Sequence, residues 1–168
     1  MNPRLALVVA ILLAMSGCAQ QPIAQHEAVP VPEPGLQPAP EPSHAGDAAI
    51  FAMAQLGSPY KFGGTSPEGF DCSGLVRYSY GLAGVALPRE TREQRKVARL
   101  LDPGDEFAAG DLLFFNFGRN SALHVGLYVG NGEFVHAPSS GGKVRVEQFD
   151  APHWKKRFLE ARRVESAI

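Results

Sequence analysis

This chain of 168 residues has few cysteines, no excess of positive or negative charge and few long apolar runs. Two cysteines, Cys18 and Cys72, exclude a scaffold held together by several disulfide bridges. The 16 basic and 17 acidic side chains nearly cancel, so no strong positive field points to a nucleic-acid partner. Only the N-terminal end is apolar enough to concern a membrane, which excludes a protein with several spans. The length suits one domain.

The first 18 residues have the sequence pattern of a secretory signal. Arg4 is followed by an apolar run over 5–15, which is too short to cross a bilayer but right for a signal peptide. Two small residues then precede Cys18, and this ending resembles a bacterial lipobox. The resemblance implies a signal peptide over 1–17 and lipidation, including palmitate, at Cys18. An ordinary signal peptide with a chance cysteine is the alternative.

Residue 19 is Ala rather than Asp, which the lipobox resemblance links to an outer-membrane lipoprotein facing the periplasm of a Gram-negative bacterium. The stretch 18–45 is proline-rich and has no Lys or Arg, so it cannot bury enough apolar surface to fold. We expect an extended tether there, with His44 in solvent, although an idle low-complexity tail is the alternative. The folded domain is then expected over 46–168, as a monomer.

Within this domain the pattern predicts helices first and strands later. Apolar spacing predicts helices over 48–56 and 72–83, and a capping-box pattern predicts a short polar helix over 91–100. Asp71 is a good N-cap for the second helix, and Thr91 with Gln94 matches a capping box for the third. Short runs rich in β-branched and aromatic residues predict strands, which we expect over 112–117, 124–129, 134–137, 143–146 and 158–164. The order favours an α+β fold with an antiparallel sheet.

Cys72 has no partner inside the chain if Cys18 carries lipid. A free cysteine is often a small core residue, so burial is one explanation. Cys72 also falls in the first turn of a predicted helix, where unpaired N–H groups favour a thiolate and lower the thiol pKa. The helix dipole contributes only about 0.3–1 kcal/mol, so activation requires a base as well.

The stretch 124–136 predicts a hairpin around Asn131-Gly132. A three-residue loop over 130–132 puts His124 and His136 on one face, with His136 opposite Gly126, where the absent side chain leaves room for the ring. Together with Cys72, this is the layout of a nucleophile, a base and a residue that orients the base.

Three other interpretations of the two histidines are weaker. A pair of histidines on strands is often exposed on the surface or forms a satisfied polar pair, and two His with Cys72 can bind zinc. The sequence has neither CxxC nor HExxH, so we expect no metal and no cofactor. His153 is expected to be structural or exposed. The arginines could meet substrate carboxylates, although we expect most of them to be solvated surface charges; they are Arg77, Arg89, Arg92 and Arg119.

Several separated blocks, in order, resemble the NlpC family of papain-like cell-wall cysteine peptidases. The matching blocks are GSPYKFGG (57–64), FDCSGLV (70–76), LPR (87–89), GDLLFF (110–115), HVGLYVG (124–130) and FVHA (134–137). The similarity runs from about residue 48 to 164. It implies a papain-like NlpC fold, with N-terminal helices packed on a central antiparallel sheet.

The resemblance also implies roles for individual residues. Cys72 corresponds to the nucleophile, His124 to the base and His136 to the third polar residue. Tyr60 matches a tyrosine that helps to hold the oxyanion, although simple aromatic packing is the alternative. Asp71 and Ser73 flank the nucleophile and are expected to contact substrate, and the Gly63-Gly64 pair is expected to let substrate backbone approach closely.

The implied activity is that of a peptidoglycan endopeptidase of the D,L type, acting through a Cys-His-His triad and a thioester. The scissile amide lies either between D-glutamate and a diamino acid or at a diaminopimelate cross-link, and the pattern does not decide between them. Two alternatives stay open. One is a non-catalytic wall-binding lipoprotein, and the other is a thiol acyltransferase or amidase with another substrate.

Overall fold

The computed structural model describes residues 43–118, 123–140 and 142–165. The expected signal peptide, Cys18, nearly all of the tether and Arg119 lie outside these ranges. No helix within them is long and apolar enough to cross a membrane.

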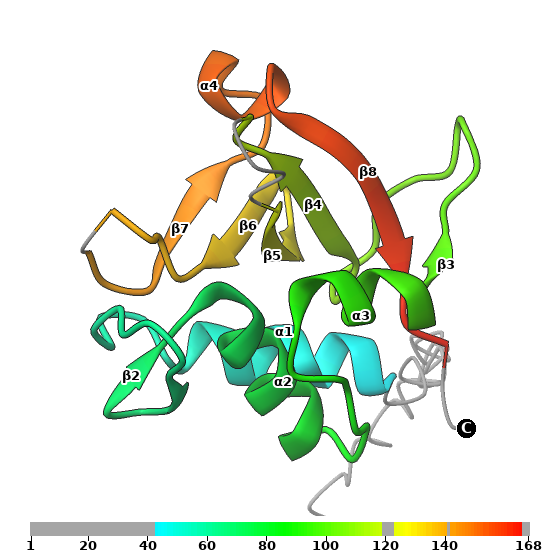
Figure 1. The fold of residues 1–168 in the computed structure, drawn as a ribbon. Coiled ribbons are helices and arrows are strands. Elements are labelled where there is room, and N and C mark those ends of the chain that lie inside the picture. The colour runs from blue at the N-terminus through cyan, green and yellow to red at the C-terminus, as the bar shows by residue number, and fades with distance from the viewer. Residues whose placement is uncertain (1–42, 119–122, 141, 166–168) are drawn as a thin grey trace, which may run out of the picture. The chain divides into compact units, whose positions relative to one another are not determined.

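The described elements confirm the α+β order, with helices leading and strands following (Figure 1). They are α1 (His44–Met53), β1 (Thr65–Ser66), β2 (Gly69–Phe70), α2 (Cys72–Leu82), α3 (Thr91–Val97), β3 (Arg99–Leu100), β4 (Leu112–Asn116), β5 (Leu123–Gly130), β6 (Glu133–His136), β7 (Arg145–Gln148), α4 (Pro152–Lys155) and β8 (Phe158–Arg163). The larger sheet is antiparallel, in the order β3-β8-β4-β5-β6-β7. β1 and β2 form a separate small hairpin.

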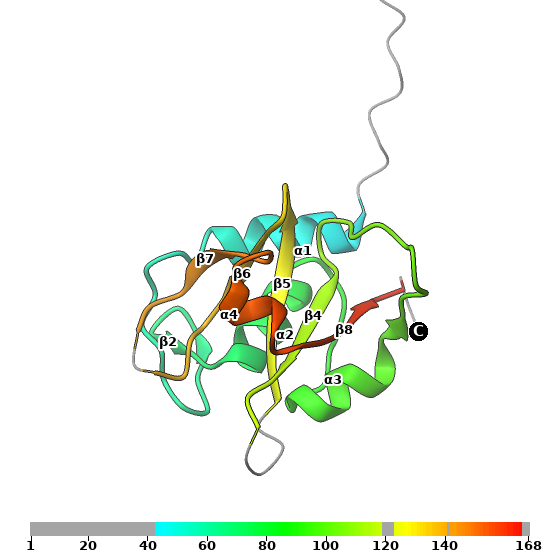
Figure 2. The same ribbon diagram turned by 90° about the horizontal axis from the view of Figure 1, so that it is seen from above.

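The sheet separates two apolar clusters. On one face, alternate residues of β4, β5 and β6, among them Phe114, Leu127 and Val135, pack against α1 and α2. On the other face, Leu113, Phe115 and Phe134 pack against Trp154 of α4. Figure 2 shows the strands lying over α1 and α2, and Figure 1 shows α4 on the far side of the sheet. The period of two along each strand produces both clusters.

The first helix begins earlier than expected and ends at Met53 rather than 56. Ser43 is its N-cap, because its hydroxyl accepts from the N–H of Gly46 at 3.0 Å. His44 is therefore helical, and its Nδ1 lies 2.6 Å from the carbonyl oxygen of Ala83 at the end of α2. His44 is exposed, as expected, but it belongs to α1 and contacts the end of α2, so the expectation that it is a bystander was wrong.

The predicted N-cap of α2 is confirmed, whereas the predicted cap of α3 is wrong. Asp71 is the N-cap of α2, as predicted, and its Oδ1 accepts from the N–H of Gly74 at 2.7 Å. The capping box at Thr91 was wrong, because Glu90 is the N-cap of α3 and no side chain caps that helix. Thr91 is instead the first helical residue, which leaves its hydroxyl free for another contact.

The β5–β6 hairpin has the predicted faces but a different turn. Leu127 pairs with Val135 and Tyr128 with Phe134, which is the register of the expected three-residue loop. Asn131 (φ 53°) and Gly132 (φ 76°) are both left-handed, which is typical of a two-residue turn. A bulge between Tyr128 and Gly130 absorbs the extra residue.

The expected space beside Gly126 is occupied by a different ring. A Cβ on Gly126 would lie 2.4 Å from Cδ2 of Phe134, so the missing side chain makes room for Phe134 and not for His136. β7 also differs, since it spans Arg145–Gln148 rather than 143–146.

Candidate active site

Cys72, Tyr60 and His124 line one cavity of about 550 Å³. They come from the start of α2, the loop after α1 and the start of β5. Asp71 and Ser73 line the same cavity. His136 lies outside its wall, buried behind His124. The fold thus gathers residues that are up to 79 positions apart in the chain, since the wall of this cavity runs from Tyr60 to Ser139.

Cys72 is partly buried, and several polar groups face its sulfur. Its Sγ lies 3.8 Å from Oγ1 of Thr91, and the backbone N–H groups of Val125 and Ser73 also favour the thiolate. Burial nevertheless outweighs these contacts and raises the pKa of the Cys72 thiol. The predicted lowering of this pKa was wrong, because the helix terminus contributes less than desolvation costs.

The two histidines meet edge to face on the α4 side of the sheet. Nε2 of His124 lies 2.8 Å from Nδ1 of His136, and the ring planes are 89° apart. Trp154 stacks on His124 and meets His136 edge-on, and Phe134 packs against His136. Burial lowers the pKa of His124 to about 4 and that of His136 to about 2, the latter helped by the charges of His124 and Arg145. Both rings are therefore neutral at neutral pH.

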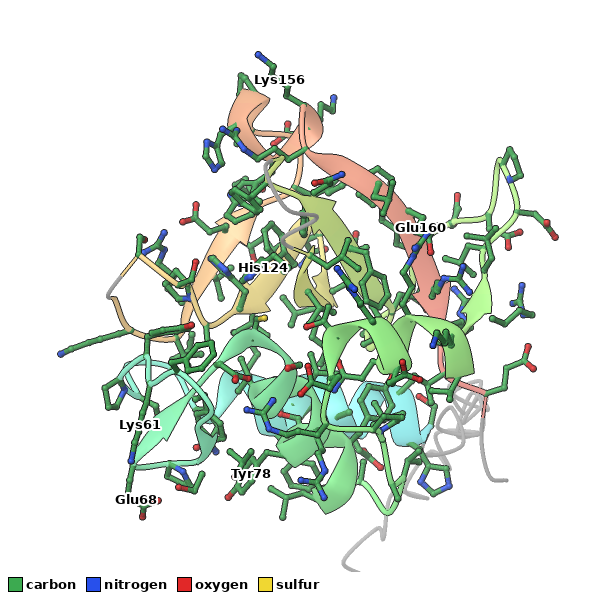
Figure 3. All side chains as sticks on the ribbon, viewed as in Figure 1. Lys61, Glu68, Tyr78, His124, Lys156 and Glu160 are labelled. Carbon is green, nitrogen blue, oxygen red and sulfur yellow. The ribbon has the colours of Figure 1, made fainter. Side chains whose placement is uncertain are left out.

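Cys72 and His124 line the same cavity. The backbone N–H of Val125, the residue after His124, favours the Cys72 thiolate. Because Nε2 of His124 is engaged with His136, its Nδ1 is the nitrogen left for the cavity. Figure 3 shows His124 among the strands of the sheet, above the helical layer that contains α2. A neutral imidazole next to a neutral thiol can accept its proton.

Tyr60 is held at the cavity by backbone pairing. Its N–H donates to the carbonyl of Gly142 at 2.8 Å, and the N–H of Val144 donates to the carbonyl of Ser58 at 2.8 Å. Burial and the nearby charges of Cys72 and Asp71 raise the pKa of the Tyr60 hydroxyl. Tyr60 therefore stays a hydrogen-bond donor in the cavity that Cys72 also lines.

Asp71, Ser73 and Arg89 form one hydrogen-bonded network at the start of α2, next to Cys72. Arg89 donates to both carboxylate oxygens of Asp71, and its Nη1 also donates to Oγ of Ser73 at 2.9 Å. Oδ2 of Asp71 accepts from the N–H of Gly63 at 3.0 Å as well. Asp71 thus ties the helix start, the Gly63 loop and Arg89 together, and Arg89 was wrongly expected to be a solvated charge.

Sequence reasoning also missed Gln94. This buried residue of α3 donates from Nε2 to the carbonyls of Ser73 and Pro88, both at 2.9 Å, and so fixes α3 against the start of α2. The capping-box pattern marked Gln94 only as part of a local helix cap, and a Gln in a polar helix is normally exposed. The Leu87-Pro88-Arg89 block was the available signal for Arg89.

The two glycines of the loop before α2 differ. Gly63 (φ 74°) lines the cavity and has open space where a Cβ would stand. A Cβ on Gly64 would lie 2.1 Å from the carbonyl oxygen of Gly69, so Gly64 serves packing inside the chain. The expectation of close substrate approach therefore fails for Gly64.

His153 is exposed, lies against Phe117 and Arg157, and is not part of the wall of the cavity that Cys72 lines. In the part of the chain that the structure describes, no group of three or more His, Cys, Asp or Glu is placed to hold a metal ion.

The part of the chain that contains these residues is similar to known proteins. A profile of the NlpC/P60 family matches residues 57–163. Murein DD-endopeptidase MepH of Escherichia coli (strain K12) is 42% identical over 118 residues, which cover 67% of this chain and 43% of MepH. The probable endopeptidase NlpC of the same strain is 34% identical over 171 residues, covering 96% of this chain and 99% of that protein.

A solved structure agrees with the sequence match. An NlpC/P60 family protein from Bacillus cereus ATCC 10987 has a TM-score of 0.66 at 31% identity, over 73% of this chain and 40% of that one. The chain spans about half the length of the first three curated relatives that it matches, MepH among them. The profile covers everything from the loop before Tyr60 to the end of β8, including Cys72 and both histidines, and the chain therefore belongs to the NlpC/P60 family.

Proposed function

We propose that this chain is a peptidoglycan endopeptidase that hydrolyses peptide cross-links with Cys72 as nucleophile. The observation that carries the proposal is the cavity shared by Cys72 and His124, with His136 bonded to the far side of the base. Two relatives support the reaction class, since one is named a murein DD-endopeptidase and the other a probable endopeptidase. The D,L bond between D-glutamate and a diamino acid is the competing cleavage site.

The first half of the reaction forms a thioester. As the Cys72 sulfur attacks the amide carbonyl carbon, its proton passes to Nδ1 of His124. The carbonyl electrons move onto oxygen, where the first-turn N–H of Cys72 and the Tyr60 hydroxyl donate hydrogen bonds. When the intermediate collapses, the C–N bond breaks and His124 gives its proton to the departing amine.

The second half releases the acyl group. His124, again neutral, takes a proton from water as the water oxygen attacks the thioester carbon. The C–S bond then breaks, the carboxylic acid leaves and the proton returns to sulfur. For Nδ1 of His124 to be the free base, its Nε2–H must donate to Nδ1 of His136, so His136 sets the tautomer.

The location of the enzyme is also part of the proposal. Cys18 carries lipid, and the proline-rich tether holds the domain off the outer membrane on its periplasmic side, within reach of the wall. Intact mass of the membrane-extracted chain measures this directly. The expected mass begins at Cys18 and includes acyl groups, and an unmodified mature N-terminus would contradict it.

Product analysis tests the activity. The full chain and its Cys72→Ala variant are incubated, under reducing conditions, with a purified cross-linked muropeptide dimer and with a tetrapeptide monomer. We expect the wild type to convert the dimer into two monomers, and Cys72→Ala to convert nothing. Release of a diaminopimelate-containing dipeptide from the monomer would assign the D,L bond instead. No products from either substrate would refute the enzyme proposal.

A further inference from the structure

A second cavity, also about 550 Å³, lies beside the active site. It is formed by α3, the facing ends of β4 and β5, and β8. All of its charged lining residues are cations, namely Arg92, Arg95, Lys96 and Arg162. The rest of the wall is Asn116, Leu123 and Leu159. A hollow with this lining fits an anion that is attached to an apolar chain.

Two features connect this basic cavity to the nucleophile. Leu123 lines both cavities. Arg92 follows Thr91, whose hydroxyl lies 3.8 Å from the Cys72 sulfur. Along α3, Lys96 lies about 7 Å beyond Thr91, because a helix rises about 1.5 Å per residue. That is the length of about two residues of extended peptide. A peptide held at Cys72 can therefore reach the basic cavity two or three residues from the scissile bond.

The cations are only partly neutralised within the described part of the chain. Arg95 pairs with Glu160 through two hydrogen bonds of 2.7 and 2.6 Å, and Arg162 contacts the same carboxylate. Figure 3 shows Glu160 on β8 above α3. Lys96 pairs with Glu93 at 2.7 Å. Arg92 forms no ion pair with any described residue. Four cations thus share two carboxylates, and Arg92 is the one left for a ligand.

We propose that the basic cavity binds a free carboxylate of the peptide substrate, two or three residues away from the bond that Cys72 cleaves. This inference rests on the proposed function. The planar guanidinium of Arg92 matches a carboxylate, and Lys96 adds a second donor on the same face of α3. Peptidoglycan stem peptides present such groups on D-glutamate, on diaminopimelate and at the terminal D-alanine. Leu123 and Leu159 give the aliphatic part of the peptide an apolar wall.

Binding to an inactive chain tests the proposal without requiring turnover. Calorimetry measures the Kd of the cross-linked muropeptide dimer for the full chain carrying Cys72→Ala, alone and with Arg92→Gln/Lys96→Gln. We expect about tenfold weaker binding when the two cations are removed. The matched control, Lys155→Gln/Lys156→Gln, removes the same charge beside α4, where Figure 3 shows Lys156 at the top of the view. It should leave the Kd unchanged.

A chemically altered ligand identifies the group that is bound. Amidation of the dimer's carboxylates should weaken binding to the Cys72→Ala chain about tenfold, and should not weaken binding further when Arg92 and Lys96 are replaced. Equal Kd values for the Cys72→Ala parent and the Arg92→Gln/Lys96→Gln chain would overturn the inference. An equal loss of affinity in the Lys155→Gln/Lys156→Gln control would also overturn it. The same holds if Arg92 and Lys96 bind phosphatidylglycerol vesicles but do not bind the muropeptide.

The two proposals fail in different ways. If the wild type cleaves the dimer while replacement of Arg92 and Lys96 changes neither Kd nor KM, the carboxylate site is refuted and the enzyme stands. If the wild type cleaves neither dimer nor monomer and Cys72→Ala binds neither, both proposals fail. A urea-unfolding midpoint equal to that of the parent chain confirms that each variant is folded. We expect this because the side chains of Arg92 and Lys96 are exposed.

Discussion

His124 and His136 form a neutral, buried pair whose facing nitrogens, Nε2 and Nδ1, lie 2.8 Å apart. The pair fixes which nitrogen of His124 faces the cavity and which tautomer it adopts. Replacing His136 with Leu removes the acceptor and should lower kcat/KM by about 10²- to 10⁴-fold. His136→Asn keeps a polar group in place and should retain more activity. Steady-state cleavage of the muropeptide dimer measures both, and equal losses in Leu and Asn variants would contradict the orienting role.

The same pair predicts how stability depends on pH. In the unfolded chain both rings protonate near pH 6.5, whereas the native rings stay neutral down to about pH 4 for His124 and about 2 for His136. Unfolding therefore takes up protons below pH 6.5, and the free energy of unfolding falls as the pH falls. The slope reaches about 1.4 kcal/mol per pH unit for each ring.

Urea unfolding at pH 7, 6 and 5 measures this slope. His136→Leu should lose about half of it, since one proton-accepting ring is gone. The Arg95–Glu160 pair contributes little in this range, because hydrogen bonds from Arg95 hold the pKa of the Glu160 carboxyl below its usual value. A free energy of unfolding that is constant from pH 7 to 5 would contradict the burial of neutral rings.

Thr91 is predicted to tune the thiol. Its hydroxyl is one of the groups that lower the pKa of Cys72 against the effect of burial. Thr91→Val removes the hydroxyl and keeps the branched shape, so the thiol pKa should rise. Alkylation of Cys72 by iodoacetamide at pH 8 should slow about three- to tenfold. Thr65→Val, in the exposed β1 strand, is the matched control, and equal rates in the two variants would contradict the contact.

Asp71 is predicted to be a stability residue as well as a neighbour of the nucleophile. Its carboxylate caps α2 and pairs with Arg89, so Asp71→Ala leaves the guanidinium and two backbone N–H groups without their acceptor. We expect a loss of about 2–4 kcal/mol in the free energy of unfolding, measured in urea. The exposed Asp150→Ala is the control and should cost under about 0.5 kcal/mol. If Asp71→Ala also lowered the free energy of unfolding by less than about 0.5 kcal/mol, the proposed stabilising role of the network would be refuted.

The elements that sequence reasoning placed correctly are those set by local periodicity. Alternation along 124–136 predicted that both histidines share one face, and the structure has that face even though the turn and bulge differ. The α2 cap was predictable because Asp71 acts on N–H groups three residues away. Local chemistry was sufficient in both cases.

The features that were missed depend on contacts between distant segments. Arg89 and Gln94 look like surface residues until α3 is packed against the start of α2. The direction of the Cys72 pKa shift depends on how deeply β5 and α3 cover the sulfur, which no helix position reveals. The helical start at His44 was missed because its partner, the Ala83 carbonyl, is 39 positions away.

The central claim, that Cys72 is the nucleophile, is tested most directly by chemical modification of the wild-type chain. Iodoacetamide is added in steps, and peptide mapping follows modification at Cys72 while dimer cleavage is measured on the same samples. Activity should fall in proportion to carboxamidomethylation of Cys72, and saturating dimer should slow both losses together. Undiminished cleavage by a chain fully modified at Cys72 would contradict the account.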